Sequence, residues 1–412
     1  MSRKFYTISE LNIDVLDGDR GKNYPKQNEF FEKGHCLFLS ASNVTNKGFN
    51  FDTTSFITKE KDDILRGGKL QRGDIVITTR GTIGNVCYYD ESISYENMRI
   101  NSGMLIVRCG EDIRSRYLYY VLKSEMFQKQ IKAIQTGSAQ PQLPKSHFVK
   151  MRIEVPEIEE QDRIIKILFA LDKKIEINDK INNNLEHQAQ LLYKNFISTT
   201  QMTNISMSEI IDVRDGTHDS PKAIDTGYPL VTSKHLLPFG VDIDSPNKIS
   251  EQDYNKANER SKVDTNDILL SMIGTVGLVS LIIEEDINFA IKNVGLFKTS
   301  KCPQYTYYVL CYLKSMEAVQ HIEKCLAGST QKYISLTELR KMPIAIPSSE
   351  KIIQFNEIVT PLFSQITNNV KENKSLSAIK DNLLSKLMSG ELDVSNINIQ
   401  DTKLLFNIST KL

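Results

Sequence analysis

The sequence predicts a mixed α/β fold in which two similar globular domains are each followed by a long helix. The two long helices are expected to pair antiparallel as a coiled coil. Three observations predict this fold: a set of short motifs that occurs twice in the same order, strand and helix patterns within each copy, and a matching seven-residue periodicity after each copy. The 412 residues suffice for two domains of about 150 residues with connecting helices.

The duplication is the strongest of these signals. Gly73–Val86 recurs as Asn266–Val279, and both segments contain a Gly-Thr-Ile/Val-Gly turn between apolar runs. Three further motif pairs occur in the same order in both copies. Near the start of each copy, Asp17-Gly18 pairs with Asp215-Gly216. After the turn segment, Gly137-Ser138-Ala139-Gln140 pairs with Gly328-Ser329-Thr330-Gln331, and Lys150–Pro156 pairs with Lys341–Pro347. The separation of the copies is too long for a solenoid repeat, so we interpret it as a duplicated domain.

Each copy combines strand and helix patterns. Ile75–Thr78, Met104–Arg108 and Ile268–Ser271 are short, rich in β-branched or other apolar residues and mostly bounded by Gly, Asp or Asn, as strands are. Tyr117–Ile134 and Tyr305–Leu326 carry apolar residues at helical spacing. This mixture predicts the α/β class for both copies.

A long helical pattern with alternating four- and three-residue steps follows each copy, which is typical of a coiled-coil seam. The predicted seam positions of the two helices are Ile164, Leu168, Leu171, Ile175, Asn178, Asn182 and Leu185 in the first and Phe355, Val359, Leu362, Ile366, Asn369, Asn373 and Leu376 in the second. Two asparagines stand in the middle of each seam, so an antiparallel pair would align Asn with Asn. A helix of about 35 residues is roughly 50 Å long and would serve as a spacer. The alternative is that each helix packs only on its own domain.

Composition excludes several classes of protein. Hydrophobic residues make up 40% and charged residues 25% of the chain, as in globular proteins, and no apolar run approaches the length of a membrane span. The N-terminus lacks the pattern of a signal peptide, so we expect a cytoplasmic protein with no membrane partner. The six cysteines form no C-x-x-C pair, which favours reduced thiols over a metal site. The formal net charge is zero, which counts mildly against DNA binding.

Together, the duplicated Gly-Thr-Ile/Val-Gly turn, the Gly-Ser-x-Gln segment before an x-Pro ending, and the closing helices resemble the specificity subunits of Type I restriction–modification systems. The resemblance covers roughly residues 5 to 395, and the ordered, duplicated set carries it rather than any one motif. It implies two target-recognition domains that read two halves of a split sequence in double-stranded DNA. It also implies two methyltransferase subunits as partners, with S-adenosylmethionine bound in those subunits and no cofactor bound by this chain, and motor-nuclease restriction subunits.

The resemblance divides the chain into 1–156 and 201–347 as target-recognition domains, 157–200 and 348–390 as spacer helices, and 391–412 as a C-terminal tail. It implies that the chain is not itself the catalyst. Consistent with this, the sequence contains no G-x-x-x-x-G-K-[ST] loop and no Asn/Asp-Pro-Pro-aromatic methyltransferase motif. Gly81-Thr82-Ile83-Gly84 is interpreted as a tight turn between strands rather than as a phosphate loop.

Residues that contact DNA are expected among polar and basic side chains on loops, because Arg and Lys bond guanine, Asn and Gln bond adenine, and phosphates attract Lys, Arg, Ser and Thr. The candidates are Arg20, Lys22, Asn23, Tyr24, Ser42, Asn43, Arg80, Gln140 and Gln142 in the first copy and Thr217, His218, Ser220, Lys222, Lys234, His235, Gln331 and Lys332 in the second. Loop positions differ between copies, as at Arg80 and Ile273, whereas the glycines agree. Divergent loops on a shared frame would let the two halves recognise different sequences.

Three alternatives remain open at this point. The chain could serve a Type IIB enzyme or another methylation-based phage-defence system, which differs only in its partners. It could be a protein–protein adaptor, which the neutral charge favours slightly. A nuclease would require clustered acidic residues and Lys at metal-ligand geometry, and the sequence shows none.

Overall fold

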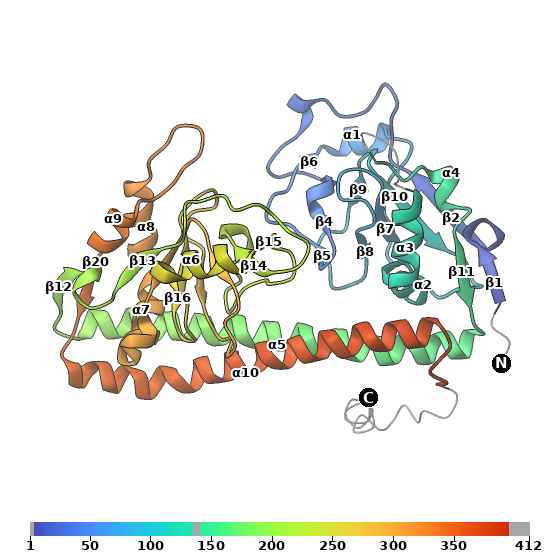
Figure 1. Ribbon diagram of the computed structural model, residues 1–412. Helices are drawn as coiled ribbons and strands as arrows, with labels where there is room; N and C mark the ends of the chain where they lie inside the picture. The colour runs from blue at the N-terminus through green and yellow to red at the C-terminus, as the bar shows by residue number, and fades with distance from the viewer. Residues whose placement is uncertain (1–3, 135–140, 395–412) are drawn as a thin grey trace. The chain divides into compact units, whose positions relative to one another are not determined.

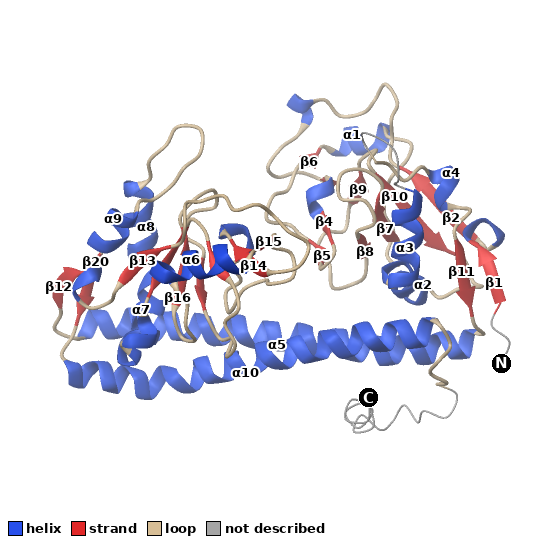
Figure 2. Ribbon diagram, in the orientation of Figure 1, coloured by secondary structure: helices blue, strands red, loops and turns tan. Residues whose placement is uncertain are grey.

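The computed structural model describes residues 4–134 and 141–394. It divides into two compact units, Met1–Lys174 with Ser375–Leu412 (unit 1) and Ile175–Lys374 (unit 2). Each unit holds one globular part and the adjoining stretches of two long helices, α5 and α10, as Figures 1 and 2 show by position and by secondary structure. The predicted class, mixed α/β with two similar domains and two long antiparallel helices, is confirmed.

A four-stranded antiparallel sheet forms the centre of each unit. In unit 1 its order is β2 (Ile13–Asp17), β10 (Met104–Cys109), β7 (Ile75–Thr78) and β8 (Val86–Tyr88). In unit 2 the same order is built from β13 (Val213–Asp215), β19 (Val294–Phe297), β16 (Ile268–Ser271) and β17 (Val279–Leu281). Strands β7 and β16 are buried along their whole length, which explains why their sequences are apolar runs rather than alternating patterns.

A three-stranded sheet packs beside each central sheet. It consists of β6 (Phe56–Ile57), β3 (Cys36–Leu39) and β9 (Met98–Ile100) in unit 1, and of β15 (Lys248–Ile249), β14 (Tyr228–Val231) and β18 (Ala290–Ile291) in unit 2. The pairs β3/β9 and β14/β18 are both parallel. Unit 1 also has the short hairpin β4 (Val44–Thr45) and β5 (Gly48–Phe49).

The first and last strands of each copy pair with one another. Strand β1 (Lys4–Thr7) is antiparallel to β11 (Arg152–Val155), and β12 (Thr203–Ser206) is antiparallel to β20 (Pro343–Ile346). The hydroxyls of Tyr117 and Tyr308 donate hydrogen bonds to main-chain carbonyls of β11 and β20 at equivalent positions. These pairings bring the start of each copy next to the strand that leads into the long helix.

Helices cover the sheets, and two segments that the sequence predicts as continuous helix are each divided. The helices are α1 (Lys59–Ile64), α2 (Ser115–Lys123), α3 (Glu125–Ile134) and α4 (Lys145–Phe148) in unit 1, and α6 (Glu251–Ser261), α7 (Thr306–Leu313), α8 (Met316–Cys325) and α9 (Leu336–Lys341) in unit 2. Ser124 and Ser315 have extended backbones at the breaks. The Ser315 hydroxyl accepts a hydrogen bond from the amide of Ala318 at 3.3 Å, so a serine cap starts a new helix inside the apolar pattern.

The long helices are α5 (Ile158–Thr199) and α10 (Ser349–Met388). In each unit their stretches lie side by side and run in opposite directions (Figure 1). None of the predicted seam residues is exposed. Pro361 lies inside α10 on its exposed side, and Gly390 has a left-handed φ of 72° just after the helix ends.

The asparagines of unit 2 pair across the seam as the sequence predicts. Asn178 Nδ2 donates to Asn373 Oδ1 at 2.8 Å, and Asn369 Nδ2 donates to Asn182 Oδ1 at 2.8 Å. Phe196 and Phe355 pack at the same seam, with ring centroids 5.0 Å apart. A polar pair inside an apolar seam fixes the register because any slip would leave buried amides unpaired.

All six cysteines are free thiols. Burial raises the pKa values of Cys36, Cys87 and Cys109 to about 12, which favours the protonated thiol at neutral pH.

Within residues 4–134 and 141–394, no helix combines the length and the apolar character needed to cross a bilayer. Most of the predicted tail 391–412 lies outside the described residues, as does Gln140.

Candidate nucleic-acid interface

The Gly-Thr-x-Gly segment is a tight turn at the end of the central sheet in both units. In unit 1 it joins β7 to β8, and Gly81 and Gly84 have φ values of 73° and 91° that only glycine adopts without strain. The Thr78 hydroxyl donates to the Thr82 carbonyl and accepts from the amide of Asn85 at 3.0 Å. The interpretation of this segment as a tight turn between strands is confirmed.

Unit 2 builds the same turn with related residues. Gly274 and Gly277 have φ values of 80° and 93°. The Ser271 hydroxyl donates to the Thr275 carbonyl at 2.5 Å and accepts from the amide of Leu278 at 2.8 Å. A hydroxyl residue at the end of the strand therefore holds the loop in both units, and the side chain just before the first glycine is free to differ.

A second segment returns to this turn in each unit. The amide of Leu143 donates to the Thr79 carbonyl at 3.0 Å, and the amide of Ile334 donates to the Met272 carbonyl at 3.0 Å. The residues just before these anchor points, Gln142 and Tyr333, are exposed beside the turn. Tyr333 was not among the predicted contacts, although its alignment with Gln142 was available from the duplication.

Three predicted contact residues from distant parts of unit 1 line one surface pocket. The pocket has a volume of about 260 Å³, and its lining includes Arg20, Arg80 and Gln142, with Lys145 and Ser146 from α4. Arg20 bonds the Asp17 carboxylate at 3.2 Å and the Ser102 carbonyl at 3.2 Å. Arg80 is exposed and makes no hydrogen bond or ion pair with any residue that the structure describes. An exposed arginine that lines a polar pocket can donate hydrogen bonds to a nucleic-acid base or phosphate.

The other unit 1 candidates have mixed settings. Lys22 and Ser42 are exposed, and Asn23 donates weakly to the Ile64 carbonyl at 3.4 Å. Tyr24 packs edge-on against Phe38 with centroids 5.6 Å apart, and burial raises the pKa of its hydroxyl.

Asn43 and His235 are buried residues with the same internal role in the two units. The main-chain amide of Ser40 donates to Asn43 Oδ1 at 2.9 Å, and that of Thr232 donates to His235 Nδ1 at 3.0 Å. Asn43 Nδ2 also donates hydrogen bonds to the main-chain carbonyls of Asn50 and Thr53. Both side chains cap a single turn of 3-10 helix from inside, so neither one faces solvent where DNA could reach it.

The remaining unit 2 candidates are on the surface. The ring of His218 lies 2.9 Å from an Asp215 oxygen and 2.7 Å from Asn293 Oδ1, and the Ser220 hydroxyl accepts from Lys292 at 2.6 Å. Thr217 is partly exposed and its hydroxyl accepts from the amide of Asp219. Lys222, Lys234, Gln331 and Lys332 are exposed as well.

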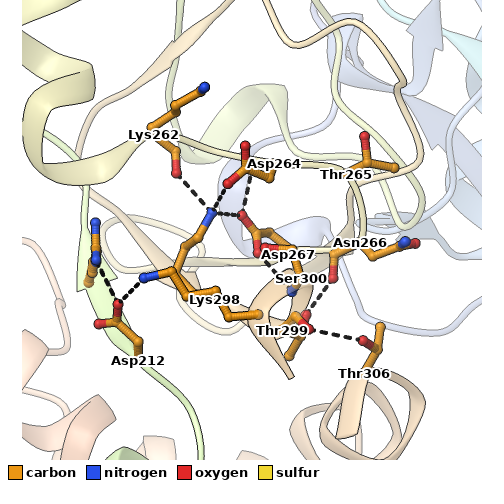
Figure 3. Close-up of polar contacts among 12 residues, drawn as sticks. Asp212, Lys262, Asp264, Thr265, Asn266, Asp267, Lys298, Thr299, Ser300 and Thr306 are labelled. Carbon is orange, nitrogen blue, oxygen red and sulfur yellow. Dashed lines mark hydrogen bonds and ion pairs between the residues drawn. The ribbon is translucent and has the colours of Figure 1, made fainter. Parts of the chain in front are cut away.

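A buried carboxylate braces the strand that precedes the turn in each unit. Asp74 precedes β7 and accepts from Arg108 at 2.8 Å through both oxygens. Asp267 stands at the same place before β16 and pairs with Lys298, which is 2% exposed and also bonds Asp264 at 2.6 Å (Figure 3). Neither ion pair was predicted, although the duplicated aspartate was visible in the sequence.

The two halves of the chain match one known family. Residues 8–187 and 201–378 each match the family model for the Type I restriction modification DNA specificity domain. The chain belongs to this family. The predicted resemblance is therefore confirmed, and the duplication corresponds to two copies of the DNA specificity domain.

Relatives of this DNA specificity family member cover most of its length. It is 28% identical over 354 residues to the Type I restriction enzyme MjaIX specificity subunit of Methanocaldococcus jannaschii, which covers 79% of each chain. It is 21% identical to the Type I restriction enzyme HindI specificity subunit of Haemophilus influenzae, over 91% of this chain and 98% of the relative. The crystal structure of the Type-I restriction-modification system S subunit from M. genitalium is similar with a TM-score of 0.49 and 18% identity, over 96% and 97% of the two chains.

Proposed function

We propose that this chain is the specificity subunit of a Type I restriction–modification complex and recognises a split sequence in double-stranded DNA, one half through each unit. The observation that carries the proposal is that two copies of a DNA specificity domain share one frame and present different side chains on it. As a DNA specificity protein, the chain is a recognition component rather than a catalyst. The proposal includes a cytoplasmic location, where the DNA would be.

The equivalent positions at the turn differ in chemistry. Unit 1 presents Arg80 and Gln142, whereas unit 2 presents Ile273 and Tyr333. Arginine and glutamine bond guanine and adenine edges in the major groove, while apolar side chains contact the thymine methyl group. Unit 1 would thus recognise its half through hydrogen bonds and unit 2 would depend more on apolar contact, with Lys222, Lys234 and Lys332 holding phosphates.

Partners supply the chemistry in this proposal. Two methyltransferase subunits carrying S-adenosylmethionine would modify adenines in the two half-sites, and motor-nuclease restriction subunits would join them. The exposed apolar residues Ile177, Ile181 and Leu191 on α5 offer one surface on which a partner could bury apolar area. A chain of zero net charge would also gain phosphate contacts from such partners.

The test is to co-express the full chain with its methyltransferase subunits and to map N6-methyladenine by long-read sequencing. A split recognition motif is expected. In the same complex, Arg80→Ala should weaken binding of the target duplex by about 1 to 3 kcal/mol, which is roughly 5- to 150-fold, and relax base preference in one half only.

Ile273→Ala is the matched control, because it occupies the equivalent position of unit 2. It should alter the other half-site and leave the first unchanged. Equal loss of preference in both halves with either variant would contradict the assignment of one unit to each half.

A further inference from the structure

Three side chains with metal-binding atoms lie together at the junction of α8 and α9 in unit 2. His321 and Cys325 are one helical turn apart on the same face of α8, and Glu338 lies on α9. Their ligand atoms all lie within 4.8 Å of one another, and all three residues are partly exposed. The cluster is thus accessible to an ion from solvent.

The geometry of the pair on α8 suits a tetrahedral ion. Cys325 Sγ and His321 Nε2 are 3.5 Å apart. A tetrahedral zinc with Zn–S of about 2.3 Å and Zn–N of about 2.05 Å places those two ligand atoms about 3.6 Å apart. The Glu338 carboxylate oxygen lies within 4.8 Å of both atoms and would have to move closer by up to about 1.2 Å to complete three ligands. The sulfur, nitrogen and oxygen donors match the preference of Zn²⁺ rather than that of Mg²⁺ or Ca²⁺.

We propose that His321, Cys325 and Glu338 bind one Zn²⁺ ion, with a water molecule as fourth ligand. Binding converts the Cys325 thiol to a thiolate, and its proton passes to solvent. This inference goes beyond the proposed function and does not depend on it. It also departs from the sequence-based expectation of no metal site, to which the absence of a C-x-x-C pair contributed.

The site is specific to unit 2. The ungapped alignment that pairs Gly137 with Gly328 and Met151 with Met342 places Gln130, Ile134 and His147 at the three positions in unit 1. Gln130 Nε2 instead donates to the main-chain carbonyl of Arg152 at 2.9 Å, and the main-chain amide of Arg152 donates to Gln130 Oε1 at 3.1 Å. Of these three unit 1 residues only His147 is a common metal ligand, so unit 1 provides an internal reference that lacks the set of three ligands.

The proposed ion would tie together the two ends of the exposed loop of unit 2. This loop joins α8 to α9 and carries Gln331, Lys332 and Tyr333 (Figure 1). The main chains of Ala327 and Tyr333 already bond each other twice, both at 2.9 Å, and close the loop at its base. A metal link between Cys325 and Glu338 adds a second closure just outside the first and restrains the segment further.

The experiment measures Zn²⁺ binding by the full-length chain against a chromophoric chelator and records the absorption spectrum after Co²⁺ substitution. The wild type should bind one equivalent, and the Co²⁺ form should show thiolate-to-metal absorption. Cys325→Ser should abolish that absorption. His321→Gln, which installs the unit 1 residue, and Glu338→Gln should each weaken Zn²⁺ binding by at least about tenfold.

Cys302→Ser is the matched control, because Cys302 is a partly exposed free thiol of the same unit outside the cluster. It should bind Zn²⁺ as the wild type does. The proposal is overturned if the wild type binds no stoichiometric Zn²⁺, or if Cys325→Ser and His321→Gln bind it as tightly as Cys302→Ser. Circular dichroism of each variant establishes that it is folded, and none of these readouts requires DNA or a partner subunit.

Discussion

Units 1 and 2 use different ion pairs at the start of equivalent strands, β7 in unit 1 and β16 in unit 2. In unit 1 the guanidinium of Arg108, 27% exposed, grips both oxygens of Asp74. In unit 2 the ammonium of Lys298, 2% exposed, lies between two carboxylates. A planar fork satisfies one carboxylate by itself, whereas a buried point charge requires a second acceptor. The comparison shows that the position of the buried aspartate is shared, while the chemistry that neutralises it is not.

The largest expected loss of stability comes from breaking the buried ion pair between Asp267 and Lys298 in unit 2. Asp267→Asn leaves Lys298 with a single carboxylate partner, Asp264, beside the Lys262 carbonyl, and should destabilise unit 2 by about 3 kcal/mol. Asp74→Asn should cost unit 1 less, about 1 to 2 kcal/mol, because water reaches Arg108. Hydrogen exchange of β16 and β19 against β7 and β10 measures the two units separately.

Asp264→Asn serves as the control, since its carboxylate is 48% exposed and Lys298 keeps its buried partner. Its effect should be smaller than that of Asp267→Asn. A larger loss from Asp74→Asn than from Asp267→Asn would refute the contrast between the units.

The next effect concerns the helix seam, where unit 2 uses buried amides. Asn182→Leu leaves the Asn369 amide without its acceptor and should cost about 1 to 3 kcal/mol. The double variant Asn182→Leu/Asn369→Leu should recover that loss, because no buried polar group remains unpaired there. Hydrogen exchange in α5 and α10 provides the coupling energy of the cycle.

Unit 1 gives the matching case with charged groups. Asp172 accepts from Lys380 at 2.9 Å and from the Tyr120 hydroxyl at 2.7 Å, and both charged residues are partly exposed. Asp172→Ala should therefore cost only about 1 kcal/mol.

If the double asparagine variant were less stable than either single variant, the seam argument would fail.

The smallest effect is a difference in pH dependence between the units. Burial, and next the charge of Lys234, lower the pKa of His235 below its ordinary 6.5. As the pH falls through 6.5, the unfolded chain takes up a proton that folded His235 does not, so unit 2 loses stability on acidification and is unaffected at higher pH.

His235→Asn installs the unit 1 residue and should remove this part of the acid sensitivity. Urea unfolding followed by circular dichroism at about pH 7.5 and about pH 5.5 measures it. If the urea midpoint changes by the same amount between the two pH values in the variant and in the wild type, His235 does not cause the acid sensitivity.

The sequence by itself determined the duplication, the strands Ile75–Thr78 and Ile268–Ser271, and the seam with its asparagines. These features are local: strand and helix periodicity is set by neighbours a few residues away, and the two copies reinforce each other. The helix breaks at Ser124 and Ser315 were missed, because an apolar period does not register a cap within it.

Only the tertiary structure decided which polar residues gather on the surface and which are buried. Arg20, Arg80 and Gln142 come from three separate segments and line one pocket, whereas Asn43 and His235, from loops of similar composition, face inward. The cluster of His321, Cys325 and Glu338 likewise forms only when α9 folds back on α8. Convergence and burial depend on contacts between residues far apart in the chain, and such contacts leave no periodic trace in one sequence.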